Sequence, residues 1–160
     1  MEQEKFIEQF GSLYENSPHI ALEIYKQHGL DAESPLEILS LMKNYVNKMD
    51  KAFKMKLILE HPELGIKKEQ SKNLTAHSQK EQKRAGLDNL SSNEYNLLSE
   101  LNKKYMNKFK FPFVIAVSGL TKEEVFSNIQ ARLKNNAKAE FNTAINEIHK
   151  IAEIRLKNLY

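Results

Sequence analysis

The chain has 160 residues, which is a typical length for one domain and enough to bury a core. Its 24 basic and 21 acidic side chains form a mixed surface of net charge +3, without the basic stripe of a nucleic-acid-binding protein. Because the chain has no cysteine, disulfides, thiolate zinc sites and cysteine nucleophiles are all excluded.

The longest apolar run, Phe111 to Val117, is too short to cross a membrane. Met1 to Phe10 lack the apolar core of a signal peptide, and the last three residues are not a peroxisomal signal. We therefore expect a cytoplasmic protein that binds neither membranes nor nucleic acid.

Apolar residues recur at helical spacing in four segments of the first half of the chain. The first segment is 3–14. Serine-proline pairs at 17–18 and 34–35 predict where the next two helices begin, with serine as the N-cap and proline at the first helical position. The fourth segment, about 51–60, ends at His61-Pro62, because a residue before proline is biased away from the α region.

The second half begins with a polar stretch, residues 63–74, that predicts a loop before a helix from about 76 to 86. Capping boxes predict two more helix starts, because Ser91 precedes Glu94 by three residues and Thr121 precedes Glu124 in the same way. A long amphipathic helix is expected over 137–158.

Residues 111–117 are apolar but too few for a helix, and Pro112 disfavours the α conformation at Phe111. An extended segment in a helical protein leaves backbone N–H and C=O groups without ladder partners. Those groups either meet a ligand or belong to chain that fills the core, and both readings stay open. We expect one all-α domain over residues 1–160, with about eight helices and this short extended segment.

His61 closes an apolar helix directly before Pro62. A helix C-terminus stabilises a cation, so one interpretation is that this imidazole holds a proton near neutral pH. The alternative is a histidine that only caps the last carbonyls.

Ser78, Glu81 and Gln82 stand at positions i, i+3 and i+4, so they share one face of the predicted helix. The segment is polar almost all round and has little apolar surface to bury, which favours a site-lining role. The alternative is a capping box from Ser78 to Glu81.

Two arginines lie beside apolar helix faces. Arg155 is in register with Phe141 and Ile148, so it either extends to water near the chain end or meets a carboxylate or an anionic ligand. Arg132, beside Leu133, is expected to be a surface or structural arginine. The histidines are scattered, and no spacing of His, Asp or Glu indicates a metal site.

Taken in order, these segments resemble the OHCU decarboxylase family, whose members convert 2-oxo-4-hydroxy-4-carboxy-5-ureidoimidazoline to (S)-allantoin in urate breakdown. The matching elements are Phe10-Gly11-x-Leu13-Tyr14-Glu15-x-Ser17-Pro18, His61-Pro62-Glu63-Leu64-Gly65, Leu74 to Leu87, Leu101 to Tyr105, Phe109 to Ile115, Arg132-Leu133-x-Asn135, Glu147-Ile148 and Ile151-Ala152 with Arg155-Leu156. No single element is decisive, but their order and spacing cover nearly the whole chain.

The resemblance implies an all-α carboxy-lyase that needs no cofactor, and a homodimer is a reasonable expectation from it. It implies that His61 is the essential acid and that Glu81 belongs to the catalytic site. The substrate-binding residues it implies are Pro62, Ser78, Gln79, Lys80, Glu81, Gln82, Phe113, Val114, Ile115, Ala116, Val117 and Arg155. Two departures occur: Gly65-Ile66 replaces the family's usual alanine-glycine, and Lys110 stands where relatives often have glycine.

A cofactor is unnecessary in principle, because a ring C=N beside the reacting carbon can accept the electrons that carbon dioxide leaves behind. We expect His61 to engage the substrate hydroxyl or to donate the proton, with Glu81 setting its protonation and orientation. Arg155 would either orient Glu81 or neutralise the substrate's charge. The competing class is a non-catalytic helical module that binds a partner helix, and a nucleic-acid binder is a third class.

Overall fold

The computed structural model describes residues 2–28, 34–65 and 74–160. Across these ranges the chain forms eight helices and no strand, so the all-α prediction is confirmed. The end of the second helix expected near Gly29, and residues 66–73 of the expected loop, lie outside the described residues.

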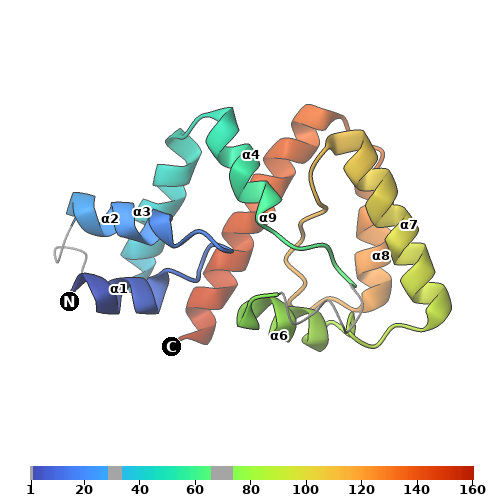
Figure 1. The fold of residues 1–160 in the computed structure, drawn as a ribbon, viewed down its shortest axis with the longest axis horizontal. Coiled ribbons are helices and arrows are strands. Elements are labelled where there is room, and N and C mark those ends of the chain that lie inside the picture. Colours follow the sequence, from blue (N-terminus) through green and yellow to red (C-terminus); the bar gives the residue numbers. More distant parts are fainter. Residues whose placement is uncertain (1, 29–33, 66–73) are drawn as a thin grey trace.

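The longest helix, α9, runs through the middle of the molecule and contacts α3, α4 and α7 (Figure 1). Helices α1 to α3 lie on one side of α9, and α7 and α8 lie on the other, while α4 lies beside its middle and α6 beside its C-terminal half (Figure 1). The bounds are α1 Gln3–Phe10, α2 Pro18–His28, α3 Pro35–Lys48, α4 Lys51–Leu59, α6 Ala76–Arg84, α7 Ser92–Phe109, α8 Lys122–Arg132 and α9 Ala137–Asn158.

Helix starts follow the local signals in the sequence. Ser34 caps α3 by accepting the Glu37 N–H at 3.2 Å. The capping boxes that begin α7 at Ser91 and α8 at Thr121 are both complete, because each third-position glutamate also accepts the N–H of its cap residue. Helix α2 begins at Pro18 as expected.

The first helix is shorter than predicted, since α1 ends at Phe10 instead of continuing to residue 14. Leu13, Tyr14 and Glu15 are all buried, at 1%, 1% and 2% exposure. Three consecutive residues cannot all lie on one face of a helix, so the chain leaves the helix in order to bury all three. Residues 11–17 consequently form an inner connection between α1 and α2.

A single cluster of buried apolar side chains extends from α1 to α9 and includes the extended segment 111–117. Phe111 and Phe113 of that segment pack their rings against Tyr105 of α7, with centroids 5.9 and 5.3 Å apart. In the ranges that the structure describes, every helix is too short or too polar to cross a membrane.

Candidate active site

A cavity opens where the end of α4, α6, the extended segment and α9 meet. Its lining is mostly apolar and carries a few polar groups, the usual character of a small-molecule site. The lining residues are His61, Pro62, Leu64, Ser78, Glu81, Gln82, Phe113, Val114, Ile115, Ala116, Val117, Ser118, Ile151, Ile154 and Arg155.

His61 is 7% exposed, and its Nδ1 lies 3.1 Å from the carbonyl oxygen of Leu57, one turn back in α4. Burial lowers the pKa of His61 to about 4, even though the Leu57 carbonyl and the nearby Glu15 carboxylate raise it. This lowered pKa argues against the interpretation that the imidazole holds a proton near neutral pH. Desolvation of the charged ring outweighs the favourable helix terminus, and the carbonyl-capping alternative describes the contact.

The tautomer of His61 follows from this contact. A carbonyl oxygen only accepts hydrogen bonds, so Nδ1 carries the proton and Nε2 of the neutral ring has a free lone pair. Nε2 is buried and has no hydrogen-bond partner among the described residues. A buried nitrogen without a partner is costly, so the cavity holds a hydrogen-bond acceptor ready for a ligand donor.

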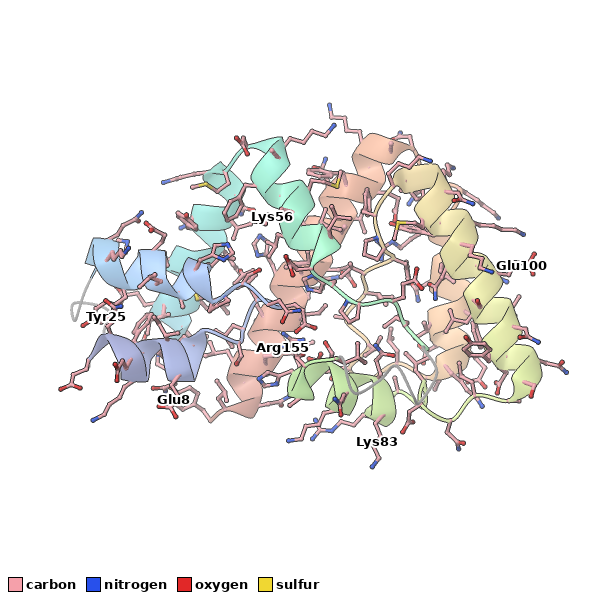
Figure 2. The ribbon with its side chains drawn as sticks, in the orientation of Figure 1. Glu8, Tyr25, Lys56, Lys83, Glu100 and Arg155 are labelled. Carbon is pink, nitrogen blue, oxygen red and sulfur yellow. The ribbon has the colours of Figure 1, made fainter. Side chains whose placement is uncertain are left out.

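Arg155 enters the cavity from α9 and points to the centre of the molecule, whereas Lys83 and Glu100 point outward (Figure 2). Its Nε lies 3.0 Å from Glu81 Oε2 and its Nη2 lies 2.9 Å from Glu81 Oε1, and Nη1 donates to the Ser12 carbonyl at 3.1 Å. The Arg155 side chain is 2% exposed. Arg155 therefore meets a carboxylate and does not extend to water.

Ser78 lies in the first turn of α6, but Thr75, not Ser78, caps this helix by accepting the Ser78 N–H. The Ser78 hydroxyl instead donates to the buried carboxylate of Glu15. Glu15 also accepts the Thr75 hydroxyl at 2.6 Å and lies 3.6 Å from Arg155 Nη2. The capping-box alternative for Ser78 is wrong, because the cap lies three residues earlier.

The Gln82 amide holds the turn that follows the His-Pro pair. Its Oε1 accepts the Gly65 N–H at 2.9 Å, and its Nε2 donates to the Glu63 carbonyl at 3.2 Å. Gly65 has a φ of +67°, which favours glycine, and a Cβ there would lie 2.4 Å from Leu98 Cδ2, so that leucine would have to shift. Gln82 lines the cavity while its amide shapes the backbone beside His61.

Gln79 and Lys80 are exposed and do not line the cavity, although both were expected to bind substrate. Five consecutive residues cover all sides of a helix, so only those spaced by three or four positions share the cavity side. The Gln79 amide donates to the Leu74 carbonyl at 3.0 Å, at the outer side of α6. The structure brings together the rest of the predicted set.

The extended segment is held from behind by two charged side chains. Arg132 Nη1 donates to the Val114 carbonyl at 2.6 Å, and the Ala116 N–H donates to Glu147 Oε1 at 3.1 Å. In extended chain, neighbouring residues turn their N–H and C=O groups in opposite directions. The backbone groups of Ile115, which lines the cavity, have no hydrogen-bond partner among the described residues and are available to a ligand.

Arg132 is buried, so the structural alternative holds and the surface alternative does not. Its Nε lies 2.7 Å from Glu140 Oε1, which also accepts the Tyr105 hydroxyl at 2.5 Å. The guanidinium carbon lies 4.4 Å from the centroid of the Phe113 ring. This cluster anchors the cavity wall from the side of α8 and α9.

A family model described as OHCU decarboxylase matches residues 1–157. The chain belongs to the OHCU decarboxylase family. It is 38% identical to a uric acid degradation bifunctional protein of Bacillus sp. (strain TB-90), with all of this chain aligned to 31% of that protein. It is 33% identical to a 2-oxo-4-hydroxy-4-carboxy-5-ureidoimidazoline decarboxylase of Haloferax volcanii, over 98% of this chain and 89% of the relative.

The crystal structure of an (S)-allantoin synthase superposes with a TM-score of 0.78 at 25% identity, over 99% of this chain and 51% of that chain. The chain thus spans less than two thirds of that synthase and of the Bacillus protein, but most of the Haloferax enzyme. The family match and the shared helical fold agree with the resemblance seen in the sequence.

Sequence reasoning for this family member missed two features of the site. Glu15 was quoted only as part of the family's opening motif, and no local pattern shows that it reaches Ser78 in α6. The Leu57 carbonyl fixes the His61 ring. Because it is a backbone group, no residue type in the sequence indicates this contact, and only its position four residues earlier could have suggested it. Among the described residues, no group of three potential metal ligands comes together.

Proposed function

We propose that this chain decarboxylates 2-oxo-4-hydroxy-4-carboxy-5-ureidoimidazoline and forms (S)-allantoin. The observation that carries the proposal is the unpartnered Nε2 of neutral His61, inside a cavity whose lining includes all of the residues implied by the family resemblance except Gln79 and Lys80. Family membership and the names of the relatives from Haloferax and Bacillus support the same reaction.

The chemistry needs little from the protein beyond positioning. The bond to the carboxylate breaks, its electron pair forms a double bond to the neighbouring ring carbon, and the C=N pair moves onto the ring nitrogen. That nitrogen takes a proton from solvent. The hydroxyl then loses its proton to become the product carbonyl, and the neighbouring carbon gains one, so one proton is consumed overall.

His61 suits both proton steps in this scheme. Its free Nε2 lone pair accepts the substrate's hydroxyl proton as the carbonyl forms, and the resulting imidazolium returns a proton to the ring carbon. The Leu57 carbonyl keeps the Nδ1 proton in place and fixes the ring throughout. His61 therefore acts first as a base and then as the acid that the resemblance implies.

Glu81 acts on Arg155 and not on the His61 ring. Its two oxygens take two of the five N–H donors of the guanidinium, and the Ser12 carbonyl takes a third. A remaining donor on Nη1 is available to the substrate. Glu81 thus aims Arg155, and Arg155 interacts with the polar groups of the substrate.

The Ile115 backbone forms the opposite wall of the site. Its N–H and C=O would pair with the planar edge of the imidazoline ring, which also carries adjacent donors and acceptors. Pro62, Phe113 and Val117 supply the apolar surface around that edge and exclude water.

Four further properties stay predictions: one domain over residues 1–160, a homodimer, a cytoplasmic location and a cofactor-free reaction. Sedimentation would test the dimer. Full activity after exhaustive dialysis against a chelator would support cofactor independence, and loss of activity that an added metal restores would contradict it.

The function itself is tested by generating the substrate in place from urate with uricase and hydroxyisourate hydrolase, because the ureidoimidazoline is short-lived. Circular dichroism then follows the decay and the handedness of the allantoin. Rapid formation of the (S) product supports the proposal. Decay at the spontaneous rate, with folded protein present, would favour a helical binding module instead.

A further inference from the structure

The carboxylate of Glu15 lies behind the cavity and is not part of its lining. The residue is 2% exposed and sits in the inner connection between α1 and α2. Two hydroxyls donate to it, from Thr75 at 2.6 Å and from Ser78. Arg155 Nη2 lies 3.6 Å from its Oε2. Glu15 therefore joins the N-terminal helices to two polar residues of the site.

These contacts fix the direction of the Ser78 hydroxyl. An ionised carboxylate only accepts hydrogen bonds, and a hydroxyl has a single hydrogen to donate. Because that hydrogen points to Glu15, the Ser78 oxygen has only lone pairs left: one faces Arg155 Nη2 at 3.5 Å, and the other is left for the cavity. A ligand N–H can bind there, whereas a ligand carbonyl would face an oxygen without a hydrogen to give.

We propose that Glu15 is a positioning residue that makes Ser78 a hydrogen-bond acceptor and so selects a ligand N–H at this point of the cavity. The inference rests on the proposed function, in which the ureido group of the substrate supplies such N–H donors. Together with His61 Nε2, the site then presents two acceptors, one for the hydroxyl and one for the ureido N–H.

Glu15→Gln tests this polarity at almost constant size. The glutamine amide brings two N–H donors beside Ser78 and leaves one acceptor for two hydroxyls, so the Ser78 hydrogen is free to turn into the cavity. We expect kcat/KM to fall about 10- to 100-fold, as for loss of a buried hydrogen bond to a charged group. Glu100→Gln, at an exposed glutamate on α7, is the charge-matched control and should keep full activity.

A double-mutant cycle shows whether Glu15 acts through Ser78. Once Ser78→Ala has removed the hydroxyl, Glu15→Gln should cost less than about threefold more in kcat/KM. Effects that multiply in the double variant would overturn the inference, because they would mean that Glu15 contributes independently of Ser78.

Folding and function are separated in the same experiment. Thermal melts are recorded for each variant, and if Glu15→Gln unfolds below the assay temperature, Glu15→Met replaces it in the cycle with the same expectation, because a side chain without an acceptor also releases the Ser78 hydrogen. An active parent protein with a multiplicative cycle overturns the inference alone. A parent protein that does not accelerate substrate decay overturns the proposed function and this inference with it.

Discussion

The guanidinium of Arg155 and the carboxylate of Glu81 form a parallel two-bond pair, with N–O distances of 3.0 and 2.9 Å. Arg155 is almost wholly buried, and two of its other three donors go to the Ser12 carbonyl and towards Ser78. The pair joins α9 to α6 across the cavity, so it supports both the fold and the site.

Replacing Arg155 by methionine should lower the free energy of unfolding by about 3–5 kcal/mol, because Glu81 and Glu15 would be left without their shared cation. Urea denaturation measures the change. Arg84→Met, at an exposed position in the last turn of α6, is the matched control and should stay within about 0.5 kcal/mol of the parent. Equal effects of the two variants would contradict the structural role of the pair.

Acid should destabilise the protein well above the range in which carboxylates titrate. Burial lowers the pKa of both His61 and His149 to about 4, below the ordinary value of 6.5. Between these values the unfolded chain binds more protons than the folded one, so stability falls as the pH drops from about 6.5 towards 4. His149→Gln should reduce this slope, since it removes one of the three histidines whose pKa burial lowers, His61, His77 and His149. If that variant left the slope unchanged, this would contradict the conclusion that burial lowers the pKa of His149.

The rate profile gives a second test of the same pKa. The pH dependence of kcat/KM reports the free enzyme, and a neutral His61 is required to accept the hydroxyl proton. The acid limb of kcat/KM assigned to His61 should therefore lie near pH 4, not near 6.5. An acid limb at the ordinary histidine value would show that the imidazole is more solvated than the structure indicates.

Glu147 should matter for substrate binding although it does not line the cavity, because it accepts the Ala116 N–H at the back of the extended segment. Glu147→Met removes this acceptor and should raise KM about tenfold, the equivalent of one hydrogen bond. Glu147→Gln keeps an amide oxygen for the same N–H and should stay within about threefold of the parent. Equal KM values for both variants would argue against the role of Glu147 in holding the extended segment.

Lys110 ends α7 with a φ of 67°, in the left-handed region that favours glycine. This is the position at which the sequence departs from the glycine common in the family. Lys110→Gly should therefore stabilise the protein by about 1 kcal/mol in denaturation experiments. Lys103→Gly, at an exposed site inside α7, should destabilise it by a similar amount. A loss of stability in the first variant would contradict the strain argument.

Much of the fold was predictable because its signals are local. Proline and capping residues mark helix starts at Pro18, Ser91 and Thr121, and each works within one turn of the chain. The early end of α1 was not predictable, because it depends on burying Glu15 against residues far along the sequence.

In the site, too, some features were predictable from local spacing in the sequence and others were not. The shared face of Ser78, Glu81 and Gln82 follows from helical spacing, and the cavity has all three in its lining. The protonation of His61 does not follow from its place at a helix end, because burial, a property of the whole fold, decides the pKa. The partner of Arg155 was likewise left open by the sequence, since several carboxylates were available to it.

The most direct test of the catalytic role of His61 is the coupled urate assay with His61→Ala beside the parent protein and His19→Ala, an exposed-histidine control. We expect His61→Ala to lose at least about 100-fold in kcat, the lower limit usual for acid–base catalysis, while its thermal melt stays cooperative. His19→Ala should behave like the parent. Near-parental turnover by a folded His61→Ala variant would contradict the central role of that imidazole.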